Sequence, residues 1–220
     1  MNYLLILFGL LPSFVWLIFY LKEDPHPEPK RTIIQTFIAG MASTVVILVL
    51  QIGFKSVMSI FTIDFYGFFS LLVFAAIEES LKFYSARSVI RRHLPDFDEP
   101  IDAMVYLIVA GLGFATVENL ATILQNPDIA IEIASLRFVG ATLLHSLTSG
   151  LIGYYWARSL ISHDRRWLGY GFIVGISLHA LFNYLIINFG ANPFITTTLL
   201  LIGVGVFVLN DFEKLKKYSS

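Results

Sequence analysis

Three charged side chains stand within five residues of one another inside an otherwise apolar stretch, Phe65 to Tyr84. They are Glu78, Glu79 and Lys82. A charge at membrane depth costs several kcal/mol by most estimates, so it persists there only when it is paired, hydrated or used in chemistry. Glu78 and Lys82 are four residues apart, which places both on one face of a helix. Carboxylates beside an ammonium group can accept a proton from water, hold a metal ion or relay protons.

Further ionisable and amide side chains lie in three later apolar stretches: Glu118 and Asn119 in 103–124, His145 in 138–157, and His179 and Asn183 in 167–189. His179 and Asn183 continue an i, i+4 series that begins with Gly171 and Gly175. Glycines at this spacing let a neighbouring helix approach closely, so this face is expected to point into a helix bundle. The three remaining apolar stretches have no acid, base or histidine in their cores. The pattern therefore predicts a polar chamber built by four helices.

The composition places these groups in an integral membrane protein. The chain has 220 residues, of which 56% are hydrophobic and 14% are charged, whereas about 25% of residues are charged in a soluble domain. There is no cysteine, which excludes disulfides, thiolate catalysis and cysteine-based zinc sites. A net charge of −1 without a basic patch gives no indication of nucleic-acid binding. We expect one integral membrane domain, 1–220, with the catalytic core helices in 65–185.

The hydrophobic pattern predicts an all-α, polytopic membrane bundle of about seven transmembrane helices. Seven apolar stretches are close to the roughly 20 residues that cross a hydrocarbon core: 3–21, 32–54, 65–84, 103–124, 138–157, 167–189 and about 194–209. Backbone polar groups must be satisfied within the bilayer, and the absence of strand-like alternation leaves helices as the solution.

Lys and Arg residues are distributed unevenly over the links between these helices. Of the 15 Lys and Arg residues, twelve lie in the links 22–31, 85–100 and 158–166 and in the tail 211–220, whereas Lys55 and Arg137 lie on the opposite side and Lys82 is inside a helix. Cytoplasmic loops carry the excess of positive charge. We therefore expect the N-terminus outside and the C-terminus, with a cytoplasmic tail at 211–220, inside the cell.

Helical rise gives an approximate depth for each polar group. At about 1.5 Å per residue, four groups fall about 5–12 Å below the outer surface: Glu118, His145, His179 and Asn183. By the same count Glu78 lies about 21 Å deep if its helix starts at Asp64, and about 16 Å deep if it starts at Gly67. The carboxylate pair is therefore the deepest part of the predicted chamber. Three charged residues at helix ends are interpreted mainly as boundary or capping residues, the last also able to anchor the site: Asp64, Asp102 and Arg137.

The order of the motifs resembles a known family. Along the chain these motifs are Glu78-Glu79-x-x-Lys82, Phe114-x-x-x-Glu118-Asn119, His145, and His179-x-x-x-Asn183. This resembles the PrsW family of bacterial intramembrane proteases, relatives of the type II CAAX prenyl endopeptidases and the bacteriocin-immunity (Abi) membrane proteins. The CAAX relatives have EExxxR and FxxxH where this chain has EExxK and FxxxE, which favours the PrsW branch and argues against prenylated substrates.

The resemblance implies an activity and a location. It implies an intramembrane endopeptidase that hydrolyses membrane-anchored regulatory proteins, such as anti-sigma factors, at or near the extracytoplasmic face of a bacterial or archaeal inner membrane. The expected partners are a single-pass membrane protein substrate and the lipid bilayer, with no nucleic acid; the sequence carries no signal for an oligomeric state.

Peptide hydrolysis needs an activated water, an oxyanion donor and a proton for the leaving amine. We expect Glu78 to be the general base, supported by Glu79, and Lys82 to hold the pair in place. His179 and Asn183 are placed to stabilise the oxyanion, and Asn119 supports the site. Two residues either orient the water or bind a metal: Glu118 and His145.

A divalent metal such as zinc is the expected cofactor of one version of this mechanism. Its candidate ligands are Glu118, His145 and His179, because glutamate and histidine can hold zinc with one position open. The three glutamates against Lys82 also leave two excess negative charges, which a divalent cation or protonation would balance. The glutamic and the metal-dependent mechanisms both stay open at this point.

Two other functions use the same residues. One is a proton- or ion-coupled transporter or channel with a Glu/His/Lys relay, and the other is a non-catalytic immunity or scaffold protein of the same fold. The transporter is disfavoured because the chain has no internal repeat and no pair of interrupted half-helices at matching positions.

Overall fold

The computed structural model describes residues 3–188 and 193–218. Within these ranges every regular element is helical. The long helices are α1 (Tyr3–Leu21), α2 (Lys30–Ile60), α3 (Phe68–Ile90), α4 (Asp102–Gln125), α5 (Ala130–Val139), α6 (Ala141–Ile161), α7 (Arg166–Asn188) and α8 (Pro193–Leu215). Three short 3-10 turns are η1 (Leu94–Asp96), η2 (Pro127–Ile129) and η3 (Lys216–Tyr218). The all-α prediction is confirmed; residue 189 of the predicted sixth helix and residues 219–220 of the predicted tail lie outside the described ranges.

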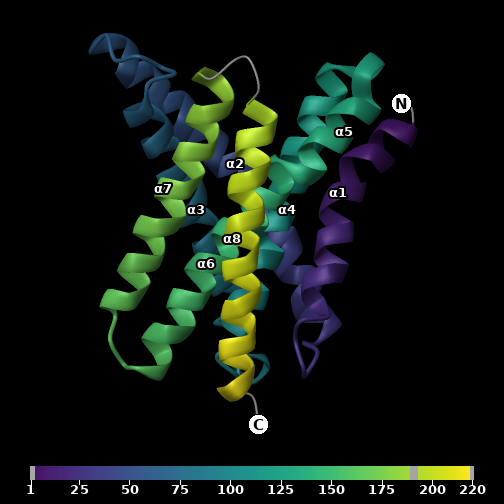
Figure 1. Ribbon diagram of the computed structural model, residues 1–220, viewed down its shortest axis with the longest axis vertical. Helices are drawn as coiled ribbons and strands as arrows, with labels where there is room; N and C mark the ends of the chain where they lie inside the picture. Colours follow the sequence, from purple (N-terminus) through teal and green to yellow (C-terminus); the bar gives the residue numbers. More distant parts are fainter. Residues whose placement is uncertain (1–2, 189–192, 219–220) are drawn as a thin grey trace.

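The helices form an elongated bundle whose axes follow the long direction of the molecule (Figure 1). By length and composition, six segments of the described chain can cross a membrane: α1, α2, α4, the stretch that contains α5 and α6, α7 and α8. Helix α3 is not among them, because Glu78, Glu79 and Lys82 interrupt its apolar character. It nevertheless packs against α2 and α7, so the membrane domain has six to seven spanning helices. The start of α1 and the end of α8 lie at opposite ends of the bundle (Figure 1).

Helix α4 is the centre of the bundle. It packs against α1, α2, α3 and α6, and every residue from Asp102 to Thr116 is buried. A Cβ atom on Gly40 of α2 would overlap the carbonyl oxygen of Ala110, and one on Gly113 would overlap that of Phe37. The backbones of α2 and α4 therefore touch, which is the close packing that small residues permit between membrane helices.

The predicted glycine face of α7 does point into the bundle. Gly171, Gly175 and His179 are buried on this helix. A Cβ atom on Gly175 would lie 2.7 Å from the side chain of Ile152 in α6, and one on Gly171 would lie 2.7 Å from Tyr155. Close contact between α6 and α7 is what brings His179 to the histidine of α6.

The boundaries of several helices differ from the predicted ones. Helix α3 starts at Phe68 after the N-cap Gly67, which is the later of the two entry points considered. The predicted helix 138–157 is α6, and a separate short helix, α5, precedes it. Gly140 divides the two, with φ −108° and ψ −104°, an angle pair that no helix continues through. Helix α8 extends to Leu215, so the stretch 211–220 begins inside a helix; its cytoplasmic position stays a prediction.

Much of the outer surface is apolar. Large side chains with more than half of their surface exposed occur on α1, α2, α7 and α8, for example Ile18, Val45, Ile173 and Phe207. A soluble protein rarely exposes so much contiguous apolar surface. These faces fit contact with lipid.

At one end of the bundle, the link before α2 is tied to the link before α4. His26 Nδ1 lies 2.8 Å from Glu99 Oε1, and the hydroxyl of Tyr106 donates to Glu28 Oε2 at 2.5 Å. Burial, followed by a hydrogen bond with Asp102, raises the pKa of Glu28 to about 9. Glu28 therefore joins its link to α4 as a protonated carboxyl group rather than as the partner of a cation.

Candidate active site

Glu79 is a fully enclosed carboxylate, whose side chain is 1% exposed. Its Oε1 atom accepts hydrogen bonds from Lys82 Nζ at 2.8 Å, His179 Nδ1 at 2.7 Å and Thr148 Oγ1 at 3.1 Å. These donors come from α3, α7 and α6, so one oxygen joins three helices. Hydrogen bonds to an ionised group are the stronger ones. Glu79 is therefore held in one orientation and fixes its neighbours in turn.

A series of polar side chains in contact with one another runs from Lys82 away from Glu79. Lys82 Nζ lies 2.8 Å from His145 Nδ1, and His145 Nε2 lies 2.8 Å from Glu118 Oε2. An ammonium group can only donate, so Nδ1 accepts and the ring proton is on Nε2, which donates to Glu118. Lys82 Nζ also stands 4.6 Å from the centre of the Phe114 ring, a cation–π contact. The aromatic residue of the Phe-x-x-x-Glu motif thus covers the buried cation.

Arg137 is the last member of this series. Its guanidinium donates to Glu118 Oε2 at 3.0 Å and to the side-chain oxygen of Asn119. Asn119 Nδ2 in turn donates to Thr142 Oγ1 at 3.1 Å. Arg137 stands in the last turn of α5, but its contacts make it an anchor of the site rather than mainly a boundary residue.

Glu78 differs from Glu79 in having one hydrogen-bond donor instead of three and in lining a groove. Its Oε1 accepts a hydrogen bond from Gln51 Nε2 at 2.8 Å, whereas its buried Oε2 has no hydrogen-bond partner within the described residues. That oxygen lies 3.5 Å from His179 Nε2. Because His179 Nδ1 donates to Glu79, Nε2 is the ring nitrogen that faces Glu78, with a lone pair in the neutral ring and with an N–H in the imidazolium. Two electron-rich atoms that face one another are stabilised only by a proton or a cation between them.

A mostly apolar groove leads to Glu78. It has a volume of about 280 Å³ and is lined by residues of α2, α3 and α7 together with Phe65. Its polar members are Gln51, Lys55, Glu78 and Asn183. Asn183 makes no hydrogen bond to another described residue, so its amide is available to a bound molecule. An apolar chain that enters the groove would therefore meet the side chain of Glu78.

Three residues of the site have donor atoms that suit a metal ion. Glu78, His145 and His179 each offer one ligand atom, and these atoms all lie within 4.8 Å of one another. The unpartnered Oε2 of Glu78 and the Nε2 lone pair of His179 fit a divalent cation in chemistry and position. Both nitrogens of His145 are engaged, so His145 joins such a set only by giving up its contact with Lys82 or with Glu118.

This set differs from the one predicted from the sequence, which contained Glu118. Arg137 and His145 hold Glu118 at the edge of the site, where its side chain is 31% exposed, and Glu78 takes its place beside the histidines. Arg137 also changes the charge balance. Three glutamates against two cations leave one excess negative charge instead of two.

All eight residues predicted for the site are in or next to this network. Glu78, Glu79, Lys82, His145 and His179 are directly connected, Glu118 and Asn119 attach to them from α4, and Asn183 lines the groove. Gln51 is missing from the predicted set, because the stretch 32–54 contains no acid, base or histidine that would mark its helix as part of the site. An amide inside an apolar helix was the available signal for it.

Comparisons with known proteins agree with the site. The model of a family described as PrsW family intramembrane metalloprotease matches residues 28–210. "Protease PrsW" from Oceanobacillus iheyensis is 29% identical over 191 residues, which cover 86% of each chain. "Protease PrsW" from Bacillus subtilis is 30% identical over 173 residues, covering 76% of this chain and 75% of the relative.

A more distant relative covers nearly the whole sequence. "Protease PrsW" from Clostridioides difficile is 23% identical over 223 residues, 97% of this chain and 91% of the relative. No solved structure matches the chain. The family match spans the helices that carry the charged network and the groove, and the chain therefore belongs to the PrsW family of intramembrane metalloproteases.

Proposed function

We propose that this intramembrane protease cleaves single-pass regulatory proteins of the anti-sigma-factor kind, close to the extracytoplasmic face of the cell membrane, with Glu78 as the reactive carboxylate. The observation that carries the proposal is the position of Glu78, which lines an apolar groove and whose buried Oε2 lies 3.5 Å from His179 Nε2. A reactive oxygen that meets the substrate needs to be free of protein donors and within reach of a peptide bond.

The groove supports a membrane-anchored substrate. Its lining is apolar apart from a few side chains that surround Glu78, so a transmembrane segment can enter it without leaving an apolar environment. Gln51 and Asn183 offer amide groups on opposite walls. An extended substrate backbone has unpaired N–H and C=O groups, and such amides can satisfy them.

The two glutamates have separate roles in this proposal. Glu78 accepts the proton of the attacking water at Oε2, and Gln51 holds its other oxygen. Glu79 is a positioning residue, because its hydrogen bond to Nδ1 of His179 sets the ring so that Nε2 faces the reaction. Asn183 donates to the oxyanion, and the protonated Glu78 returns the proton to the leaving amine.

In a metal-dependent version of this proposal, Glu78, His145 and His179 would hold a divalent metal ion, and Oε2 of Glu78 would be a ligand instead of the base. Such an ion, when bound, polarises the peptide carbonyl and lowers the pKa of a bound water. Glu79 then acts as the carboxylate behind a metal-ligating histidine, an arrangement that fixes the ring and raises its basicity. Zinc is the metal that this combination of nitrogen and oxygen donors favours.

The test is cleavage of a single-pass substrate by the purified protein in detergent. We expect Glu78→Gln to lower the cleavage rate at least about 1,000-fold, the scale of losing a central catalytic group, while the protein stays folded. Glu132→Gln is the matched control, because Glu132 is exposed on α5 and away from the groove. Full activity of Glu78→Gln would remove the base assignment. Ion flux in liposomes without any cleavage would favour a transporter instead.

A further inference from the structure

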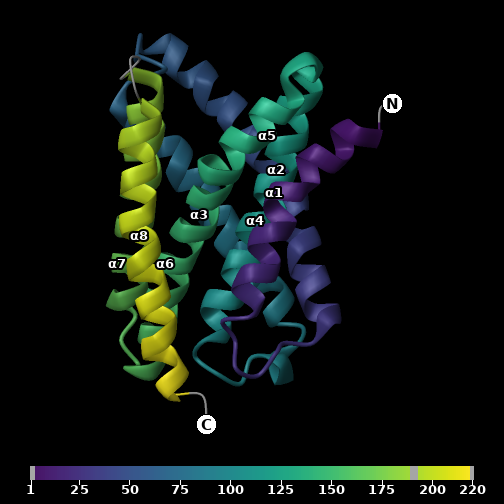
Figure 2. The same ribbon diagram turned by 45° about the vertical axis from the view of Figure 1, so that its right-hand side comes forward.

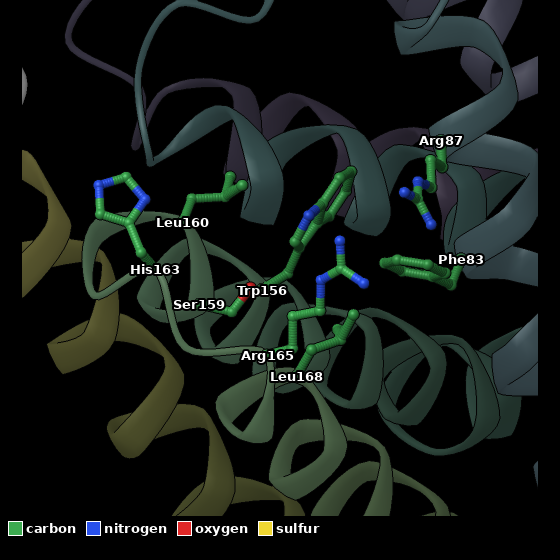
Figure 3. Close-up of a pocket in the computed structure, with 8 residues that line it drawn as sticks. All are labelled: Phe83, Arg87, Trp156, Ser159, Leu160, His163, Arg165 and Leu168. Atoms are coloured by element: carbon green, nitrogen blue, oxygen red, sulfur yellow. The ribbon is translucent and has the colours of Figure 1, made fainter.

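A second cavity lies at the end of the bundle away from α5, between the last turns of α3 and α6 and the start of α7 (Figures 1 and 3). Its volume is about 510 Å³. Arg87 enters it from α3, Arg165 from the turn before α7, and Phe83 and Trp156 form much of its floor. It is separate from the Glu78 groove, whose lining shares no residue with it.

The two arginines of this cavity have no counter-ion. Neither guanidinium forms an ion pair or a hydrogen bond with another residue in the described part of the chain, and no Asp or Glu lines the cavity. The nearest acid in sequence, Asp164, is paired with Arg166 at 2.8 Å. Figure 3 shows both guanidinium groups turned toward the same space beside the Phe83 ring. Two like charges at the edge of a low-dielectric bundle repel, and an anion between them would offset that repulsion.

The helix dipole accounts for the position of Arg87 but not for that of Arg165. Arg87 stands in the last turn of α3, where a cation is favoured by the partial negative charge of the helix end. Arg165 precedes α7, however, and a cation at a helix N-terminus is disfavoured by the same effect. Two guanidiniums that converge on one cavity from such different positions indicate a shared ligand.

The remaining walls indicate the kind of anion. Phe83 and Trp156 are 3% and 7% exposed, and Leu160 and Leu168 complete an apolar lining, with Ser159 as a neutral donor. This end of the bundle also carries most of the Lys and Arg residues of the links. Basic pockets between membrane helices on the positively charged side accept anionic lipid headgroups, and planar guanidinium groups bind phosphate through paired hydrogen bonds.

We propose that this cavity binds the headgroup phosphate of an anionic phospholipid, with Arg87 and Arg165 on the phosphate and the aromatic floor beneath the glycerol and the first acyl carbons. The lipid would hold α3, α6 and α7 together at the end opposite the groove. The proposal is independent of the protease mechanism, because it involves none of the residues placed in the active site.

The experiment is native mass spectrometry of the full chain released from mixed phosphatidylglycerol and phosphatidylcholine micelles. We expect the wild type to retain phosphatidylglycerol preferentially. The double variant Arg87→Gln, Arg165→Gln should lose roughly 30-fold of that preference, about fivefold for each arginine near a lipid phosphate. The matched control is Arg91→Gln, Arg92→Gln, which removes two exposed charges at the same end of α3 outside the cavity and should retain the preference.

Each other outcome overturns the assignment. Equal losses in the two double variants would mean attraction by surface charge alone, and no preference in the wild type would mean no site. Displacement of the lipid by millimolar glycerol phosphate, at the same occupancy, would identify a soluble phosphate as the ligand. If the Gln variant does not fold, Arg87→Lys, Arg165→Lys keeps the charge but not the paired geometry, and it should show an intermediate preference.

Discussion

At the scale of single residues, the adjacent glutamates Glu78 and Glu79 have different hydrogen-bond partners and different proposed roles. Oε1 of Glu79 accepts hydrogen bonds from three donors, whereas Oε1 of Glu78 accepts one, and only Glu78 lines the groove. The difference follows from helix geometry, because neighbouring positions on a helix point about 100° apart and meet different partners. Glu79 points at the Lys82–His145 pair, and Glu78 points at the groove.

We expect Glu79→Gln to reduce cleavage less than Glu78→Gln does. The amide keeps the size of the side chain but weakens the hold on His179 Nδ1, and loss of such a carboxylate behind a histidine typically costs about 10- to 100-fold in activity or metal affinity. Steady-state kinetics should show the loss in kcat with little change in KM. A Glu79→Gln enzyme as inactive as Glu78→Gln would mean that Glu79 itself takes part in the chemical step.

Arg137 gives a second prediction at this scale. It holds Glu118 and Asn119, so Arg137→Gln leaves a carboxylate at the edge of the site without its cation. We expect a loss of about 1–3 kcal/mol in unfolding free energy and a lower cleavage rate. Thermal unfolding in detergent measures the first effect, with partial rescue by Arg137→Lys. If Arg137→Gln is as stable as the wild type, these contacts contribute no more than an exposed ion pair does.

Much of the site could be predicted from residue types, for a physical reason. A charge in a membrane helix is costly, so Glu78, Glu79 and Lys82 are conspicuous without any structure. Gln51 is uncharged and does not stand out, and Arg137 lies in a link where charges are common, so it was interpreted mainly as a boundary residue that could also anchor the site. Which glutamate joins the histidines also depends on how α3 and α4 are rotated against α6, and the order of residues along the chain does not determine that.

At the scale of helices, the crossing of α2 and α4 controls the position of Gln51. Backbone contact at Gly40 leaves no room for a methyl group beside Ala110. We expect Gly40→Ala to cost about 1–3 kcal/mol, the usual effect of overpacking, and to lower cleavage because Gln51 moves with α2. Gly53→Ala on the same helix is the control, since nothing lies within 4 Å of its added Cβ. Similar melting temperatures for the two variants would contradict the close crossing.

The links at one end of the bundle give a prediction about pH. The pKa of Glu28 is raised from 4.5 to about 9 in the folded protein, so the folded state binds a proton that the unfolded state releases between these values. Stability should therefore fall as pH rises from about 5 to about 9. Several other titratable groups surround it: Asp24, His26, Glu99, Asp102 and Tyr106.

The Glu28→Gln variant isolates this contribution. The amide keeps a hydrogen bond with Tyr106 but does not titrate, so the pH profile of its melting temperature should be flatter than that of the wild type between pH 5 and 9. An identical slope in both proteins would assign the pH dependence to the surrounding groups.

Helix count and type were predictable at this scale, whereas helix ends were not. Apolar length identifies a spanning segment, and seven such stretches correspond to α1, α2, α3, α4, α6, α7 and α8. The short helix α5 was missed because ten residues in a polar link carry no such signal. The late start of α3 at Phe68 depends on Gly67 and a turn that ends α2 at Ile60, and it is what brings Glu78 level with His179.

At the scale of the whole molecule, the uneven distribution of Lys and Arg predicts the direction of insertion. Helix α2 has 31 residues and is about 46 Å long, which exceeds a hydrocarbon core of about 30 Å. Its far end carries Lys55, which lines the groove, and lies on the side with few positive charges. The α6–α7 turn lies at the opposite end (Figure 2).

The absence of cysteine from the chain makes this orientation testable with single substitutions. We expect a membrane-impermeant thiol reagent to label Ser59→Cys, at the end of α2, in intact cells. Ser162→Cys, between α6 and α7, should be labelled only after the cells are opened. The reverse pattern would place the groove on the cytoplasmic side and would contradict an extracytoplasmic cut.

The most direct measurement of the central claim is the metal content of the purified protein, determined together with its cleavage of a membrane-anchored substrate. If Glu78, His145 and His179 form the reaction centre, the wild type binds a single divalent ion per chain. Glu78→Ala and His179→Ala should lose both the ion and the activity, and Glu118→Gln should keep the ion. A wild type that cleaves at full rate without metal and in excess chelator would contradict the metal-binding centre, and a Glu78→Ala variant that retains full activity would contradict a role of Glu78 in the reaction.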